Sequence, residues 1–176
     1  STNNCTFNKY LGRKCTMSFS ELNITKQLLS ALTDLGFTNA TPIQSAAFPV
    51  IMSGADAVGI AQTGTGKTFA YLLPSLRQLN FSQQKAPRII IIVPTRELVV
   101  QVINECEKLC KYQTVRVGGI YGGANINTQR QLLFNGLDVL VATPGRLLDM
   151  ILDRALIVTS LQKLIIDEVD EMLSLG

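Results

Sequence analysis

The sequence contains no histidine and no tryptophan, and it has only four cysteines, Cys5, Cys15, Cys106 and Cys110. Without histidine the commonest general base is missing, so any catalysis must use carboxylates, lysine, arginine or a metal. A zinc site would need all four thiols, which lack the usual Cys-x-x-Cys spacing. Cys106 and Cys110 lie four residues apart in a helical pattern, which favours one face of a helix and reduced thiols in a cytosol.

Long apolar runs and a strong charge of either sign are also missing. No stretch approaches the roughly 18 residues that span a bilayer, and no basic segment followed by an apolar one opens the sequence. The net charge of +3 permits an anionic partner without requiring one. With 47% hydrophobic residues in 176, the chain can bury the core of one domain. We expect a cytoplasmic protein with no membrane partner.

Apolar periodicity gives the domain organisation. Residues 1–17 are polar and aperiodic, and we expect a flexible N-terminal extension there, followed by one domain over residues 18–176. The patterns predict helices over 20–35, from Thr41-Pro42 onward, and over 67–79, 95–111, 125–135 and 144–154, and strands over 57–60, 88–93, 114–117, 138–142 and 163–166. This alternation predicts an α/β fold whose parallel sheet carries helices on both faces.

Polar signature segments follow strand after strand: AQTGTGKT, PTREL, GGIYGG, TPGR and DEVD. In open α/β sheets, ligands bind beyond the carboxyl ends of the strands. The sequence therefore predicts that the chemistry lies along one edge of the sheet.

The segment AQTGTGKT fits a phosphate-binding P-loop, with alanine where the strict pattern has glycine. Backbone N–H groups of such a loop face phosphate oxygens, and the following helix adds its positive end. The predicted nucleotide-binding residues are Thr63, Gly64, Thr65, Gly66, Lys67 and Thr68. Lys67 would reach the β- and γ-phosphates, and the Thr68 hydroxyl would bind Mg²⁺. A chance glycine turn is the alternative, which the position between a strand and a helix disfavours.

Two acids end the strand predicted over 163–166. Asp167 is placed to hold Mg²⁺, largely through water, and Glu168 to orient the attacking water. An exposed acidic turn is the alternative, which the P-loop disfavours. We therefore predict Lys67, Asp167 and Glu168 as the catalytic residues.

Gln44 is a candidate for recognising the adenine base of the nucleotide. A glutamine amide carries a donor and an acceptor side by side, which matches the N6 and N7 atoms of adenine, whereas guanine offers two acceptors there. A surface glutamine at an ordinary helix start is the alternative reading of Thr41-Pro42-Ile43-Gln44.

Taken together, these motifs resemble the first RecA-like domain of DEAD-box RNA helicases over about nine-tenths of the chain. The matching segments are Gly36–Gln44 with the upstream Phe19 (Q motif), AQTGTGKT (motif I), Pro94–Leu98 (motif Ia), Gly122-Gly123 (the GG doublet), Thr143–Arg146 (motif Ib) and Asp167–Asp170 (motif II). Val169 departs from the family, since it replaces the alanine that gives the family its name, and we expect a tolerated variant.

The resemblance implies ATP and Mg²⁺ as cofactors, with Phe19, Phe37 and Gln44 on the nucleotide side. It also implies RNA as a partner, bound through its backbone with little sequence preference. The residues expected to contact RNA are Pro94, Thr95, Arg96, Gly122, Gly123, Thr143, Pro144, Gly145 and Arg146. Arginine pairs well with phosphate oxygens, glycine admits a close backbone, and helix starts face anions. Taken singly, a Thr-Pro start is ordinary capping and a Gly-Gly segment an ordinary turn.

The sequence ends before the family's Ser-Ala-Thr motif and its second RecA-like domain, so we expect the first domain to be incomplete at its C-terminus. In the family, the second domain supplies arginines that stabilise the transferring phosphate. We therefore expect an ATP-dependent RNA helicase as the parent protein and an isolated chain that binds adenine nucleotide without unwinding RNA. A nucleotide- or RNA-binding module without turnover, or a DNA helicase of related fold, remains the alternative.

Overall fold

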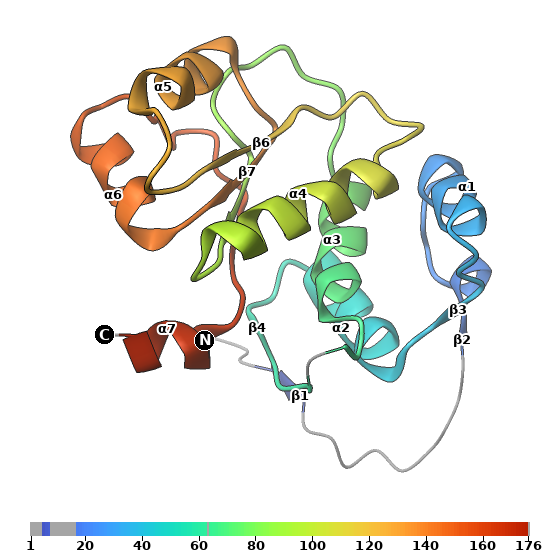
Figure 1. Cartoon of the computed structure of the whole chain (residues 1–176). Coiled ribbons are helices and arrows are strands. Elements are labelled where there is room, and N and C mark those ends of the chain that lie inside the picture. The colour runs from blue at the N-terminus through green and yellow to red at the C-terminus, as the bar shows by residue number, and fades with distance from the viewer. Residues whose placement is uncertain (1–4, 8–16, 63, 176) are drawn as a thin grey trace. The chain divides into compact units, whose positions relative to one another are not determined.

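The computed structural model describes residues 5–7, 17–62 and 64–175 (Figure 1). The chain divides into two compact units. The first comprises residues 1–80 and 108–113, and the second comprises residues 81–107 and 114–176. The P-loop and the Q motif belong to the first unit, whereas the four later motifs belong to the second.

Three helices build the first unit: α1 (Lys26–Asp34), α2 (Pro42–Met52) and α3 (Lys67–Arg77). Helices α2 and α3 pack closely on each other. The predicted helix over 20–35 begins later than expected because Thr25 caps it, accepting a hydrogen bond from the Leu28 N–H at 3.3 Å. The residues before it form a short 3₁₀ turn, η1 (Phe19–Glu21), with its own capping box.

Two short ladders complete this unit. Strand β2 (Met17–Ser18) pairs antiparallel with β3 (Asn39–Ala40), and β1 (Cys5–Phe7) pairs parallel with β4 (Ala57–Gly59). The structure therefore differs at Cys5–Phe7 from the flexible extension expected over 1–17, because β4 offers an edge whose backbone groups these residues can pair with. Residues 1–4 and 8–16 of that expected extension lie outside the described residues.

A four-stranded parallel sheet forms the centre of the second unit, in the order β6-β7-β5-β8. The strands are β5 (Ile89–Ile92), β6 (Val117–Ile120), β7 (Val139–Ala142) and β8 (Lys163–Ile166). The inner strands β5 and β7 are almost wholly buried, as their aliphatic runs predict. The predicted parallel sheet is thus confirmed.

Helices cover both faces of this sheet, as predicted (Figure 1). Helices α5 (Ile126–Asn135) and α6 (Pro144–Leu152) lie on one face. The core there comprises Ile90, Ile120, Leu133, Leu137, Leu140, Ala142, Leu147, Met150 and Leu156. Residues 96–107 of helix α4 (Arg96–Leu109) cover the opposite face. A short helix, α7 (Val169–Leu175), follows β8, and the sequence did not predict it. No helix in the described part combines the length and apolar character that a membrane crossing requires.

Two glycines explain how α4 and α5 approach β6. The predicted strand over 114–117 was placed too early, and Gly118 and Gly119, expected in a loop, lie inside β6. A Cβ on Gly118 would lie 3.0 Å from Leu137, on the α5 side, whereas a Cβ on Gly119 would lie 2.6 Å from Ile103 of α4. Glycine is needed at both positions because a helix approaches the strand closely from each face. The sequence prediction was wrong here because it took these glycines as a loop.

An ion network closes the amino-terminal end of the sheet. The Asp138 carboxylate is buried and accepts hydrogen bonds from the Arg88 guanidinium at 2.9 Å and from the Arg116 Nε at 3.0 Å. The Arg116 backbone N–H donates to it as well, at 2.9 Å. One carboxylate therefore connects the residues that immediately precede β5, β6 and β7.

Candidate functional site

The P-loop leads into α3 through two glycines in the left-handed region. Gly64 has φ +81° and Gly66 has φ +85°, conformations that L side chains rarely adopt. Gly66 is the N-cap of α3 and has no side chain to cap the helix, so the first turn's N–H groups face the loop side. The Thr65 hydroxyl donates to the Gln62 carbonyl at 2.6 Å. Thr63 lies outside the described residues.

Gln44 joins the Q motif to the P-loop. Its Oε1 accepts from the Thr41 N–H at 2.9 Å, completing a capping box at the start of α2, and its Nε2 donates to the Gly66 carbonyl at 3.1 Å. A Cβ on Gly66 would lie 2.4 Å from that Nε2. The side chain is only 5% exposed. In this structure, both ends of the amide that was predicted to bind adenine are therefore engaged with the protein.

The two phenylalanines predicted on the nucleotide side differ in accessibility. Phe37 is 48% exposed and meets Phe69 edge to face, with ring centroids 5.5 Å apart. Phe19 is 1% exposed, and its backbone N–H donates to the Thr38 carbonyl at 3.0 Å. Phe37 can contact a ligand, whereas Phe19 is a core residue that supports the neighbouring loop. The roles of Phe19 and Phe37 on the nucleotide side therefore stay predictions.

Asp167 and Glu168 stand directly beyond β8. The Asp167 N–H donates to the Ile92 carbonyl of β5 at 2.9 Å, and its Oδ1 accepts from the Glu168 N–H at 3.0 Å. Glu168 has φ +53°, which is uncommon for a residue other than glycine. Helix α7 begins from this residue, because the Met172 N–H donates to the Glu168 carbonyl. The unusual backbone falls on a predicted catalytic residue, where such conformations often cluster.

The donor set suits Mg²⁺ bound by few protein ligands. Thr68 offers a hydroxyl and Asp167 a carboxylate, which are hard oxygen donors of the kind that Mg²⁺ prefers. Among the described residues, no three His, Cys, Asp or Glu side chains gather into a metal cage. Because Mg²⁺ keeps several waters, each of these oxygens is a suitable ligand for a hydrated Mg²⁺ ion.

The predicted RNA residues of the second unit follow three neighbouring strands. Thr143 comes directly after β7, and Thr95 and Gly122 come within three residues of the ends of β5 and β6; the carboxyl ends of these strands meet at one sheet edge. Asp167, after β8, lies at the same edge. Gly122 and Gly123 are exposed, with nothing within 4 Å of an added Cβ. The structure therefore places these four motifs along one edge of the sheet, as the sequence predicted for them. The P-loop, which the sequence assigned to the same edge, belongs to the first unit, and the strand before it, β4, is not part of the four-stranded sheet.

Arg96 and Arg146, both predicted to bind phosphate, have different surroundings. Arg96 is exposed at the start of α4 and lies over the Tyr121 ring, 5.2 Å from its centroid. The Arg146 side chain is 11% exposed, and its Nη1 donates to Gln129 Oε1 at 2.8 Å and to the Ala124 carbonyl at 3.4 Å. Arg146 is thus turned into the protein, although Pro144 and Gly145 beside it are exposed.

The sequence is similar to known proteins. The DEAD/DEAH box helicase family model matches residues 41–176. The chain belongs to the DEAD/DEAH box helicase family. It is 42% identical to the DEAD-box ATP-dependent RNA helicase CshA of Streptococcus pneumoniae, over 91% of this chain and 30% of that protein. It is 43% identical to the ATP-dependent RNA helicase SrmB of Escherichia coli, over 90% of this chain and 36% of that protein.

A fungal relative shows the same partial coverage. The chain is 38% identical to the ATP-dependent RNA helicase HAS1 of Pyricularia oryzae, over 90% of this chain and 28% of that protein. The chain thus spans roughly a third of the length of these helicases. Its α/β fold is the one expected for a RecA-like helicase domain.

Sequence reasoning missed Gln129, which is buried beside the carboxyl ends of β6 and β7. Its Nε2 donates to the Tyr121 carbonyl at 3.1 Å, and its Oε1 accepts from the Tyr121 N–H at 3.3 Å as well as from Arg146. A polar residue on the apolar side of a predicted helix, in register with Ile126 and Leu133, was the available signal. Such a residue needs hydrogen-bond partners when it is buried.

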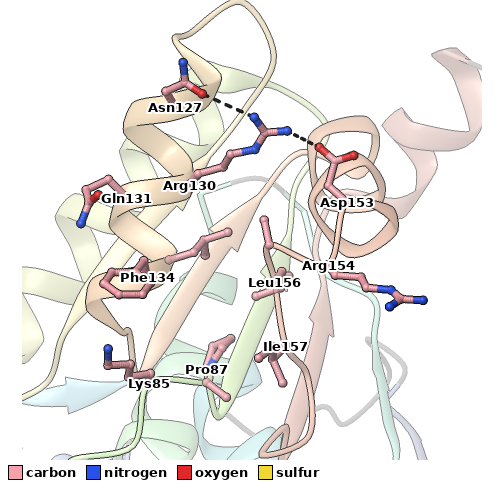
Figure 2. Close-up of a pocket in the computed structure, with 13 residues that line it drawn as sticks. Lys85, Pro87, Asn127, Arg130, Gln131, Phe134, Asp153, Arg154, Leu156 and Ile157 are labelled. Atoms are coloured by element: carbon pink, nitrogen blue, oxygen red, sulfur yellow. Dashed lines mark hydrogen bonds and ion pairs between the residues drawn. The ribbon is translucent and has the colours of Figure 1, made fainter.

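The second unit also has a hollow of about 820 Å³ at the opposite end of the sheet (Figure 2). It lies between α5, the segment before β5 and the segment that follows α6. In Figure 2, Arg130 of α5 bridges to Asp153 across the top, and Phe134 and Ile157 lie on opposite sides below. Pro87 precedes β5 and therefore lies at the amino-terminal ends of the strands, which separates this hollow from the family motifs.

Proposed function

We propose that this chain is the ATP-binding domain of an ATP-dependent RNA helicase, which couples ATP hydrolysis to local unwinding of RNA duplexes. The observation that carries the proposal is the P-loop geometry within a co-linear set of helicase motifs, which the family match covers from Thr41 onward. The relatives from S. pneumoniae and E. coli carry that activity in their names.

The phosphate end of the site rests on Lys67 and Thr68, the first two residues of α3. In the proposed complex, the α3 N-terminus and the loop N–H groups bind the phosphates, and Lys67 neutralises their charge. Mg²⁺ would supply a counter-charge to the phosphate oxygens, and the Thr68 hydroxyl and the Asp167 carboxylate are the oxygens that the family resemblance assigns to it. Glu168 would orient the attacking water, a role open to a carboxylate in a chain without histidine.

The base end of the site rests on Phe37 and Gln44. Exposed Phe37 offers an aromatic surface to adenine. Gln44 would bind adenine by exchanging its hydrogen bonds to Thr41 and Gly66 for bonds to the base. Because its Nε2 contacts the Gly66 carbonyl, this exchange would connect recognition of the base to the conformation of the P-loop.

The RNA side rests on the sheet edge of the second unit. Exposed Arg96, Gly122 and Gly123 can meet a phosphate backbone there without reading bases. Because the chain spans about a third of its relatives, turnover and unwinding are proposed for the whole protein, completed by a second RecA-like domain. We propose that the chain alone binds adenine nucleotide without unwinding RNA.

Titration calorimetry of the 176-residue chain with Mg²⁺ tests this function. ATP should bind at least about tenfold more tightly than GTP, because guanine offers no donor where adenine has its N6 group. Equal affinity for ATP and GTP would remove the Q-motif assignment. Absence of binding by either nucleotide would remove the proposal as a whole.

A further inference from the structure

Gln129 binds both backbone polar groups of Tyr121, in the loop between β6 and α5. Its amide accepts from the Tyr121 N–H and donates to the Tyr121 carbonyl, at 3.3 and 3.1 Å. The side chain is 5% exposed, so water does not compete for these bonds. Tyr121 immediately precedes Gly122, and its position therefore sets where the exposed glycine doublet starts.

Arg146 fixes the other end of the same loop. Its guanidinium donates to the Ala124 carbonyl, directly after Gly123, and to Gln129 Oε1. The Arg146 Nε lies 3.9 Å from the Asp149 carboxylate, within α6. With 11% exposure, this side chain is directed toward protein acceptors and away from solvent.

Glycines need such support. An exposed Gly-Gly segment has large conformational freedom, and binding a ligand requires that freedom to be lost. Gly123 also has φ +78°, which its own side chain cannot enforce. Residues on both sides of the doublet can hold it in one conformation before the ligand arrives.

We propose that Gln129 and Arg146 form one clamp that positions Gly122 and Gly123 for the RNA backbone, and that Arg146 does not itself bind a phosphate. Gln129 is a positioning residue, since it acts through the loop. Arg96 has the opposite role. Its exposed guanidinium lies over the Tyr121 ring and can donate its N–H groups to a phosphate. This inference rests on the proposed RNA-binding function.

The test measures binding of fluorescein-labelled oligouridine to the 176-residue chain by anisotropy, over a series of salt concentrations. Gln129→Leu removes the clamp without changing charge, and it should weaken binding about tenfold, the effect of roughly one hydrogen bond. Gln131→Leu is the matched control. Gln131 lies on the same helix, is exposed and bonds only to Asn135 among the described contacts, so it should leave binding unchanged.

Salt dependence separates the two roles of arginine. Loss of one phosphate contact lowers the slope of log K against log salt by about 0.7 for a single strand. Arg96→Met should lower the slope in this way, whereas Arg146→Met should weaken binding with the slope unchanged. Gln129→Leu combined with Arg146→Met should bind as weakly as either single variant, because both remove one clamp.

The outcomes are distinguishable. Additive losses, or a lower slope for Arg146→Met, would overturn the clamp and return Arg146 to phosphate binding. If the unaltered chain binds no oligouridine, the proposed RNA function fails instead. The clamp is then still tested by NMR, where Gln129→Leu should make the amides of residues 121–124 mobile while the rest of α5 stays ordered. Unchanged loop order in that variant would refute the clamp.

Discussion

Replacing Asp138 by asparagine should destabilise the second unit strongly. The carboxylate is 2% exposed, and each oxygen accepts from two donors of Arg88 and Arg116. An asparagine keeps one acceptor oxygen and turns an NH₂ group toward the other two donors, so two of the four hydrogen bonds are lost, together with the negative charge. Removing one partner of a buried ion pair costs about 3–5 kcal/mol. Because the Arg116 side chain is 34% exposed, solvent reduces the cost, and we expect about 2–4 kcal/mol.

Urea unfolding of the 176-residue chain measures this effect, and Asp153→Asn is the matched control. Asp153 also pairs with an arginine, Arg130, but both side chains are more than 40% exposed. Exposed pairs contribute about 0–1 kcal/mol, so the control should lose little stability. Equal losses in the two variants, or a loss below about 1 kcal/mol for Asp138→Asn, would refute a stabilising role for the buried network.

The same network predicts a pH dependence. Burial tends to raise the pKa of Asp138, but hydrogen bonds from Arg116 and Arg88 outweigh it and hold the pKa below the ordinary value of 3.8. The stabilisation is therefore present above that value and is lost as the pH falls through the lower pKa of the folded state. Asparagine does not titrate, so the stability difference between wild type and Asp138→Asn should shrink below about pH 4. A difference that stays constant down to pH 2 would contradict this reasoning.

Three further outcomes follow from the site and the sheet. Lys67→Ala should abolish ATP binding in calorimetry with an unchanged circular dichroism spectrum; Lys26→Ala, at the first position of α1, is the control and should bind normally. The isolated chain should show almost no RNA-stimulated phosphate release in a turnover assay, and robust stimulation would contradict its assignment as one part of a larger catalytic unit. Gly119→Ala should cost about 1–3 kcal/mol in urea unfolding through overpacking against Ile103 and Val99, and Gly122→Ala, with open space around it, should cost less.

The order of elements could be predicted because local patterns determine it. Runs of β-branched residues predict buried strands such as Ile89–Ile92. The pair Thr41-Pro42 predicts a helix start, because it supplies the N-cap and the first helical residue. The start of α1 and the extent of β6 could not be predicted as well. Helix α1 begins after Thr25, and not after an earlier polar residue, because of a single capping hydrogen bond. In β6 the glycines are required because a helix packs closely on each face of the strand.

The function of a motif residue could be predicted from the sequence only where its residue type is suited to a single function. Left-handed Gly64 and Gly66 fit a phosphate loop because few other residues adopt that backbone. Arginine, glutamine and phenylalanine serve equally well as ligand contacts and as internal supports. Phe19 is buried while Phe37 is exposed, and Arg146 is mostly buried while Arg96 is exposed. Burial, which depends on contacts distant in sequence, makes that distinction.

The difference between exposed and buried motif residues determines how substitutions at these positions should be interpreted. A change at Arg96 removes a charge from an exposed edge, so its effect on RNA binding should vary with salt. A change at Arg146 or Gln44 also removes hydrogen bonds that the protein makes to itself, to Ala124 in one case and to Gly66 in the other. Loss of ligand binding in such a variant therefore does not show that the side chain touched the ligand. Only a readout specific to the contact, such as the salt slope for RNA or the preference for ATP over GTP, separates binding from positioning.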